Sequence, residues 1–246
     1  MDRMLYVAMT GARQTMQAQA VNANNIANVN TTGFRQDLAA MRSMPVYGPG
    51  MPSRVYGMTE KPGTDLNSGS LMTTGRSLDV ALKGQGWIAV QGQDGNEAYT
   101  RAGDLQVTST GLLQTGAGHL VMGNAGPISL PPSSKIEIGG DGTISMVAQG
   151  DEAADMQEVD RIKLVNPPTD ALYKGEDGLM RLAEGEQAEA DANVRLAVGS
   201  LESSNVNIAE ALVNMIDLAR QFEMQVKMMK TAERNDQKAA QIMQLS

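Results

Sequence analysis

The sequence predicts an α+β protein whose N- and C-terminal helices form a coiled-coil-like end domain around a central antiparallel β-rich domain. Two observations carry this prediction. Apolar residues recur in alternating steps of three and four near both ends of the chain, which places them on one stripe of a helix. Between residues 78 and 201 the pattern changes to short apolar runs separated by Gly-containing turns, which is typical of antiparallel strands.

The first predicted helix covers residues 2–29. Its stripe has one polar member, Gln19, and consists of Leu5, Met9, Ala12, Met16, Gln19, Ala23 and Ile26. The polar run from Asn28 to Thr32 and the following Gly33 end the helix, and we expect Gly33 to take the left-handed conformation. Phe34 would then anchor the chain against the C-terminal helix or a neighbouring subunit. We expect this corner to set subunit geometry with little effect on the stability of the β-rich domain.

Residues 34–77 contain four prolines and several glycines, so we expect an extended connector with little regular structure. Residues 78–201 should form the β-rich domain. Asp94-Gly95 predicts a hairpin between 87–90 and 99–101. Residues 136–138 and 144–147 are predicted as further short strands, and Asp141-Gly142 predicts another tight turn.

The C-terminal helix begins after Asn207, whose side chain can cap the helix, with Glu210 three residues further on. Its main stripe consists of Ile208, Leu212, Met215, Ala219, Phe222, Val226 and Met229. A second, thinner stripe consists of Val213, Ile216, Met224 and Met228. One partner helix cannot cover two stripes, so this helix needs more than one neighbour.

These expectations divide the chain into four segments: 1–33, 34–77, 78–201 and 202–246. The acidic residues are concentrated in the middle of the chain. Residues 44–205 hold 11 basic and 21 acidic residues, a net charge of −10 within a total of −8. No basic stripe suited to nucleic acid is present, and no run of about 20 apolar residues could insert in a membrane. The sequence contains no Cys, which excludes disulfides and thiolate metal sites.

The sequence shows no pattern of catalytic residues, which argues against an enzyme. The single histidine, His119, stands between Gly118 and a predicted strand without a nucleophile or metal-binding motif beside it. Gly84-Gln85-Gly86 leads into a strand rather than a helix, so it does not predict a phosphate site. We therefore expect no cofactor, no metal and no catalytic residues.

Three segments resemble the signatures of the bacterial flagellar rod and hook proteins. The first is Ala23-Asn24-Asn25-Ile26-Ala27-Asn28 followed by Thr32-Gly33-Phe34-Arg35. The second includes Leu78-Asp79-Val80-Ala81-Leu82, Gly86-Trp87 and Tyr99-Thr100-Arg101-Ala102-Gly103. The third is Leu201-Glu202-Ser203-Ser204-Asn205-Val206-Asn207 followed by Arg220-Gln221-Phe222-Glu223. The resemblance covers nearly the whole chain in the right order, and within the family it is strongest to the proximal-rod proteins.

The resemblance implies a non-enzymatic axial subunit that transmits motor torque. Such a subunit would be exported unfolded by the flagellar type III apparatus without a cleaved signal peptide, and would assemble in the periplasmic rod of the basal body. Its partners would be copies of itself, other rod proteins and the export apparatus. We expect both helical stripes to form the assembly interface, together with Asn24, Asn25, Asn28, Gly33 and Phe34. The three asparagines could equally serve local capping and turn formation.

Two alternatives stay open on the sequence alone. The chain could be a distal-rod or hook-type axial subunit, which differs only in its neighbours. It could also be a soluble coiled-coil adaptor or chaperone that binds a partner through its terminal stripe.

Overall fold

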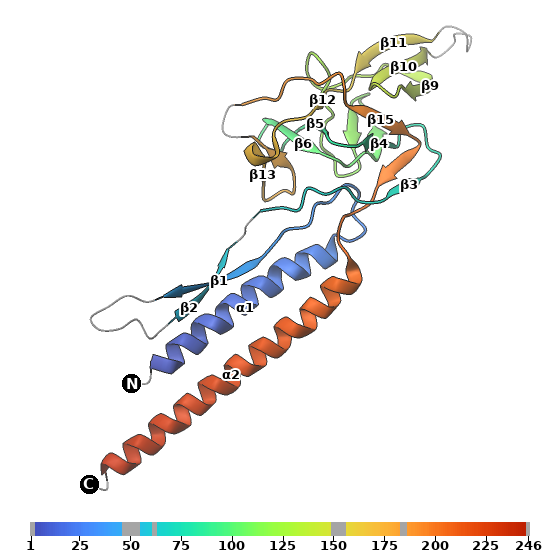
Figure 1. The fold of residues 1–246 in the computed structure, drawn as a ribbon. Coiled ribbons are helices and arrows are strands. Elements are labelled where there is room, and N and C mark those ends of the chain that lie inside the picture. Colours follow the sequence, from blue (N-terminus) through green and yellow to red (C-terminus); the bar gives the residue numbers. More distant parts are fainter. Residues whose placement is uncertain (1–2, 46–54, 61–62, 149–155, 183–185, 245–246) are drawn as a thin grey trace. The chain divides into compact units, whose positions relative to one another are not determined.

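A computed structural model describes residues 3–45, 55–60, 63–148, 156–182 and 186–244. The chain divides into two compact units (Figure 1). The helical unit contains Met1–Asn28, Asp37–Gly63 and Val206–Ser246. The β unit contains Val29–Gln36 and Thr64–Asn205. The antiparallel β-rich middle of the chain and its two terminal helices confirm the predicted α+β class.

In the helical unit, α1 (Arg3–Ala27) and α2 (Ile208–Gln244) lie side by side (Figure 1). Small residues line the α1 face that packs inside the unit: Ala8, Ala12 and Ala18 are buried. A Cβ on Gly11 would come within 2.9 Å of the Gln225 amide of α2, so small side chains let the helices approach closely. Asn22 of α1 donates a hydrogen bond from Nδ2 to the backbone oxygen of Ala211 in α2, at 2.7 Å.

The start of α2 is capped as the sequence predicts. The side-chain oxygen of Asn207 accepts hydrogen bonds from the backbone N–H groups of Ala209, at 3.1 Å, and Glu210, at 3.4 Å. These bonds satisfy two of the N–H groups that have no partner within the helix. The predicted helix start is therefore confirmed.

The helical unit also contains a hairpin of β1 (Ala40–Pro45) and β2 (Val55–Glu60), which contacts α1. The two strands are antiparallel, and Arg42 lies opposite Met58. Residues 34–77, which we expected to be a connector with little regular structure, therefore contain paired strands. Residues 46–54 and 61–62 of that stretch lie outside the described residues.

The β unit is built from antiparallel sheets. A five-stranded sheet has the order β12 (Leu164–Val165), β5 (Trp87–Gln91), β6 (Glu97–Thr100), β14 (Met180–Arg181) and β13 (Tyr173–Lys174). A three-stranded sheet has the order β11 (Gln157–Arg161), β10 (Thr143–Ala148) and β9 (Ser133–Ile138). Three strand pairs complete it: β15 (Arg195–Val198) with β4 (Val80–Lys83), β16 (Ser200–Glu202) with β3 (Leu71–Thr73), and β7 (Leu105–Val107) with β8 (Leu113–Thr115). A short 3₁₀ helix, Thr169–Ala171, precedes β13.

The predicted hairpin and the predicted tight turn are both present. β5 pairs with β6 around Asp94-Gly95, and β9 pairs with β10 around Asp141-Gly142. Gly95 has φ +80° and Gly142 has φ +89°, the conformation that favours glycine in these turns. Fully buried apolar side chains from several strands form the core, among them Ile88, Leu105 and Ile144.

The β unit draws on residues from all four segments that the sequence analysis distinguished. Residues 29–36 precede the predicted body, and residues 64–77 belong to the predicted connector. Within the β unit, β3 pairs with β16, with Met72 opposite Leu201. The two strands are far apart in the sequence, so a reading of local patterns does not detect their pairing.

Candidate assembly surface

The predicted stripe on α1 is largely open to solvent. Met9 is 53% exposed and Met16 is 57% exposed, and Leu5 and Ala23 are exposed as well. Gln19 and Ile26 are half-buried, and only Ala12 is buried. The face that packs inside the unit is displaced by one position and consists of Ala8, Ala12, Thr15, Ala18, Asn22 and Asn25. The large apolar side chains of α1 therefore remain available for a contact outside the subunit.

The predicted stripe on α2 is exposed at the start of the helix and half-buried along the rest. Ile208 and Leu212, at the start of the helix, are exposed. The remaining members are half-buried: Met215, Ala219, Phe222, Val226 and Met229. The most deeply buried α2 side chains are Ala211 and Ala232, which the sequence analysis did not select. This stripe is thus partly covered within the subunit and open at its beginning.

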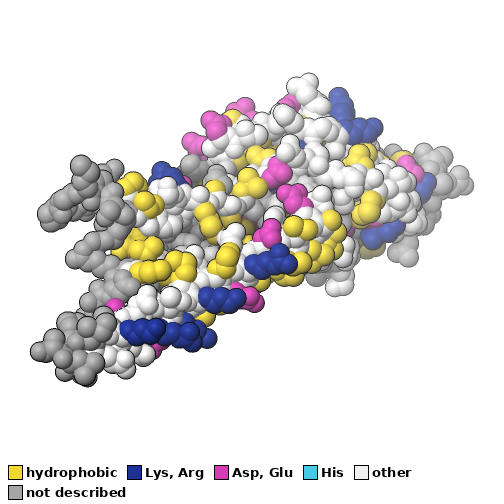
Figure 2. All heavy atoms as spheres, turned by 60° about the horizontal axis from the view of Figure 1, so that its bottom comes forward, with side chains coloured by type: hydrophobic (Ala, Val, Ile, Leu, Met, Phe, Trp, Pro, Cys, Tyr) yellow, Lys and Arg dark blue, Asp and Glu magenta, His cyan; other side chains and the backbone are white. Residues whose placement is uncertain are grey.

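The second stripe on α2 is exposed along its whole length. Val213 is 58% exposed, and Ile216, Met224 and Met228 are exposed too. Figure 2 shows a row of Lys and Arg side chains along α2 with hydrophobic side chains beside it. An apolar helix face left open in one subunit is the arrangement expected of an interaction surface.

The three selected asparagines make contacts inside the subunit. Asn25 is buried, and its amide forms two bonds with the backbone of Asp37: Nδ2 donates to the oxygen at 2.8 Å, and Oδ1 accepts from the N–H at 3.0 Å. Asn28 donates from Nδ2 to the backbone oxygen of Asn24 at 2.9 Å, while the Asn24 side chain is exposed. Asn22, which bonds α2, was not selected, although it lies one turn before Asn25 and Ile26.

Gly33 has the predicted left-handed conformation, with φ +66°. A Cβ there would lie 2.3 Å from the backbone carbon of Arg101, so this position excludes every larger residue. The Gly33 N–H donates to the backbone oxygen of Glu202 at 2.8 Å. Gly33 is therefore packed into the β unit, and the premise that this corner is remote from that unit is wrong.

Phe34 has a different contact from the one expected. The ammonium of Lys174 in β13 lies 4.0 Å from the centre of the Phe34 ring, and the same Lys174 Nζ donates to the backbone oxygen of Arg35 at 2.7 Å. This cation–π contact holds Phe34 in the β unit. The expected anchor was the C-terminal helix or a neighbouring subunit, because the sequence pattern cannot show that β13 lies beside residues 34–35.

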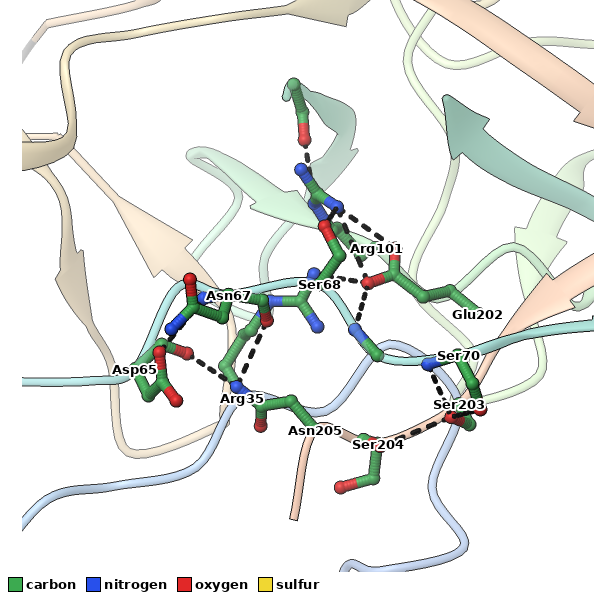
Figure 3. Close-up of polar contacts among 12 residues, drawn as sticks. Arg35, Asp65, Asn67, Ser68, Ser70, Arg101, Glu202, Ser203, Ser204 and Asn205 are labelled. Atoms are coloured by element: carbon green, nitrogen blue, oxygen red, sulfur yellow. Dashed lines mark hydrogen bonds and ion pairs between the residues drawn. The ribbon is translucent and has the colours of Figure 1, made fainter. Parts of the chain in front are cut away.

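A buried polar cluster lies next to Gly33, and Figure 3 shows its members. The Glu202 carboxylate accepts hydrogen bonds from Arg35 Nη2, Arg101 Nη1 and the N–H of Gly69. Arg101 also donates from Nε to the oxygen of Gly86 at 2.9 Å and from Nη2 to the oxygen of Gly84 at 2.8 Å. We call Arg35, Arg101 and Glu202 the polar hub.

The polar hub places two guanidinium groups around one carboxylate. Both guanidinium groups also lie near the Trp87 ring, at 5.8 Å from its centre for Arg35 and 5.3 Å for Arg101. Arg35 Nε and Nη1 have no hydrogen-bond partner among the described residues. The attraction between the guanidinium and the electron-rich face of the Trp87 ring partly replaces these missing hydrogen bonds. Burial lowers the pKa of Arg101, while the charge of Glu202 acts in the opposite direction.

Asn205 extends the polar hub along the chain (Figure 3). Its Oδ1 accepts from the N–H of Gln36 at 2.7 Å, and its Nδ2 donates to the backbone oxygens of Asp65 and Asn67. The Ser70 and Ser203 hydroxyls are bonded at 2.8 Å. Residues near 35, 67, 101 and 203 are thus joined by side-chain bonds. None of these residues was expected to form a bonded cluster, although Arg35, Arg101, Glu202 and Asn205 lie within the three segments quoted above; Asp65, Asn67 and Ser70 lie in the stretch expected to be a connector.

Nothing in the described part of the chain suggests a reaction centre. Its residues contain no group of three or more His, Cys, Asp or Glu side chains that could hold a metal ion. None of the described helices is both long enough and apolar enough to cross a membrane.

Comparison with known proteins assigns each of the three segments to one family. The model "Flagella basal body rod protein" matches residues 5–35, "Flagellar hook protein FlgE/F/G D1 domain" matches residues 81–146, and "Flagellar basal body rod FlgEFG protein C-terminal" matches residues 197–242. Curated relatives match over the full length. The chain is 44% identical over 252 residues to the flagellar basal-body rod protein FlgF of Escherichia coli, covering 100% of both chains.

The FlgF of Salmonella typhimurium gives the same identity and coverage. The flagellar basal-body rod protein FlgG of Bacillus subtilis is 30% identical over 256 residues, covering 95% of this chain and 96% of its own. The resemblance to FlgF is therefore the stronger of the two. The chain belongs to the family of flagellar basal-body rod proteins.

Proposed function

We propose that this chain is a structural subunit of the proximal rod, assembled through its terminal helices to transmit motor torque. As a flagellar rod protein it is a structural component of the basal body and not an enzyme. The observation that supports assembly through the helices is the exposure of large apolar side chains on both. Met9 and Met16 on α1 and Leu212 on α2 are left open in the single subunit.

The partners follow from the family. Other rod components are its neighbours in the basal body, and copies of the chain itself are proposed as further neighbours. We also propose that the chain reaches the periplasm unfolded through the flagellar type III apparatus, without a cleaved signal peptide. The absence of Cys suits a chain that crosses into an oxidising compartment.

Folding of the helical ends is proposed to be completed by assembly. The fully buried side chains of α1 include small ones such as Ala8 and Ala18, which each bury little apolar area, and the larger α2 side chains Phe222 and Val226 are only half-buried. Ordering a helix costs about 1–2 kcal/mol per residue in backbone entropy. Contacts of the exposed stripes with neighbouring subunits would supply the missing stabilisation.

The alternatives now have unequal support. A distal-rod or hook-type role remains the second candidate, because FlgG also matches nearly the full chain, but at 30% identity against 44% for FlgF. A soluble adaptor or chaperone has no support from the relatives, whose names describe rod proteins.

The proposal is tested by complementation of a strain that lacks its own copy of this subunit. Met16→Asp and Leu212→Asp each place a charge on an exposed apolar side chain that one subunit leaves uncovered. Both variants should be secreted but should abolish swimming and leave basal bodies without hooks. Met156→Asp, at a similarly exposed Met of the β unit, is the matched control and should swim. Normal swimming by both helix variants would reject assembly through these faces.

A further inference from the structure

The exposed methionines of this chain are concentrated in the helical unit. Nine methionines are exposed among the residues that the structure describes: Met4, Met9, Met16, Met41, Met44, Met72, Met156, Met224 and Met228. Seven of them belong to the helical unit, and only Met72 and Met156 belong to the β unit. Within the β unit, Met146 and Met180 are buried. Solvent therefore reaches thioether sulfur atoms mainly on the helical unit.

Four of these methionines lie on the apolar stripes of the two helices. Met9 and Met16 are seven residues apart on the α1 stripe, and both are more than half exposed. Met224 and Met228 are four residues apart on the second α2 stripe. These spacings place the members of each pair on one face of their helix. We call Met9, Met16, Met224 and Met228 the helix methionines.

Sulfur is the atom of this chain that mild oxidants attack most readily. The sequence has 18 Met and no Cys, so thioethers are its only sulfur atoms. With hydrogen peroxide, the S–O bond forms as the O–O bond breaks, so the sulfur is oxidised and the peroxide is reduced. The proton on the transferred oxygen passes to the leaving hydroxide, which becomes water. Susceptibility follows the access of the oxidant to the sulfur, so the exposed methionines should react first.

The product of this reaction changes the chemistry of the helix faces. A sulfoxide carries a polar oxygen in place of the apolar thioether. In the free subunit that oxygen is hydrated. When a neighbour covers the face, the oxygen loses its water, and its burial without a hydrogen-bond donor is unfavourable. Oxidation therefore leaves the fold of the free subunit intact and weakens the contacts that cover the helix methionines.

We propose that the helix methionines are a reversible oxidation site through which peroxide decides whether a free subunit can be assembled. This inference rests on the proposed function, because it requires that neighbouring rod proteins cover these faces. Methionine sulfoxide reductases convert the sulfoxide back to the thioether, so an oxidised subunit can be recovered. Subunits already in the rod are protected, because their neighbours keep the oxidant away from the same sulfur atoms.

Mass spectrometry of the purified full-length chain tests the site itself. In hydrogen peroxide, the helix methionines should form sulfoxides at least about tenfold faster than Met146 and Met180. In concentrated urea, where the fold shields no sulfur, the rates of all six should agree within about twofold. Circular dichroism should show that the chain oxidised without urea keeps its fold. Equal rates for all six in the folded chain, or loss of the fold on oxidation, would overturn the proposal.

The same measurement on isolated basal bodies tests the protection. In basal bodies from the complemented deletion strain, the helix methionines should oxidise at least about tenfold more slowly than in the free subunit. Met156 in the β unit serves as the internal reference for the amount of oxidant that reaches the particles. Helix methionines that react as fast in the rod as in the free subunit would contradict the proposal.

Substitution by glutamine tests the consequence for assembly. Gln is polar like a sulfoxide, so a chain with Gln at all four helix methionines should be secreted but should give at least about fivefold fewer hooked basal bodies. Leu at the same four positions is apolar and close to Met in volume, so it should preserve hook formation. Met72→Gln with Met156→Gln makes the same change on the β unit and should also preserve it. Normal hooks with the fourfold Gln chain would overturn the proposal.

The two proposals can fail separately. If the unaltered chain does not restore swimming to the deletion strain, the rod function is rejected whatever the oxidation rates are. If the chain restores swimming but its helix methionines react no faster than Met146 and Met180, only the oxidation site is rejected.

Discussion

Arg35 and Glu202 form an ion pair in which both side chains are almost wholly buried, at 2% and 1% exposure, although 167 positions separate them in the sequence. One residue follows the first helix and the other precedes the second. A buried pair of this kind adds little net stability compared with apolar residues, but loss of one partner leaves a charge without compensation. The pair therefore requires that both segments be in place before the β unit is complete.

Removal of the carboxylate should destabilise the β unit strongly. Glu202→Gln leaves two buried guanidinium groups, those of Arg35 and Arg101, without their counter-charge, at a cost of about 3–5 kcal/mol in unfolding free energy. Urea denaturation measures this loss. Glu60→Gln removes the partner of Arg42 in an exposed pair, so it is the control and should cost no more than about 1 kcal/mol. Equal effects of the two substitutions would contradict a special role for the polar hub.

A substitution at Gly33 should also destabilise the β unit. Gly33→Ala adds a Cβ within 2.3 Å of the Arg101 backbone at a φ of +66°, so both clash and strain oppose folding. We expect urea denaturation to show that the unfolding free energy falls by about 3 kcal/mol or more. Gly75→Ala is matched in backbone conformation, with φ +77°, but has nothing within 4 Å of its Cβ. Gly75→Ala should lower the unfolding free energy by only about 1 kcal/mol. If Gly33→Ala lowered it by no more than this control, the backbone around Arg101 would have moved away from the added Cβ.

The sequence predicts those features of this fold that depend on neighbouring residues. Asn207 is recognisable as a cap because the N–H groups it accepts from are two and three residues away, and Gly33 is recognisable as a left-handed position because it ends a polar run. The polar hub is not predictable in this way, since Arg35, Arg101 and Glu202 meet only after the strands have paired. The packed face of α1 lies one position away from the predicted stripe, because the stripe follows large apolar side chains whereas the buried positions hold Ala, Thr and Asn.

Asn25 should matter for the helical unit rather than for contacts between subunits. Asn25→Ala removes two hydrogen bonds to the Asp37 backbone from a buried position, which should cost about 1–3 kcal/mol. The expected result is a lower thermal midpoint of the helical signal in circular dichroism. Asn24→Ala changes an exposed side chain of the same type and should leave that midpoint within experimental error. If Asn24→Ala blocked hook formation while Asn25→Ala did not, the assembly role would belong to the exposed amide.

Ionisation of Tyr99 should lower the stability of the β unit at alkaline pH. Burial raises the pKa of its phenol to about 12, above the ordinary value of 10. The folded protein holds this proton more tightly than the unfolded chain does. The stability that the protonated phenol contributes is therefore fully present below pH 10 and is lost as the pH rises toward 12. Urea midpoints between pH 8 and pH 11.5 should fall less steeply for Tyr99→Phe, although that variant starts lower because it loses the bond accepted from the Ala188 N–H at 2.8 Å. Identical slopes would show that Tyr99 ionises normally.

Trypsin should cleave the dilute monomer faster after exposed arginines of the helices than after buried arginines of the β unit. Arg13 in α1 and Arg220 in α2 are exposed and lie in helices that are proposed to need neighbours for full order, so both should be cut early. Arg35 is buried in the polar hub and should be cut late, together with Arg101. Mass spectrometry of a time course gives the order. In the Glu202→Gln chain, Arg35 should become an early site while Arg13 is unchanged, because residues 29–36 lose their ion pair. If Arg35 were cut as fast as Arg13 in the unaltered chain, residues 29–36 would not belong to the stable β unit.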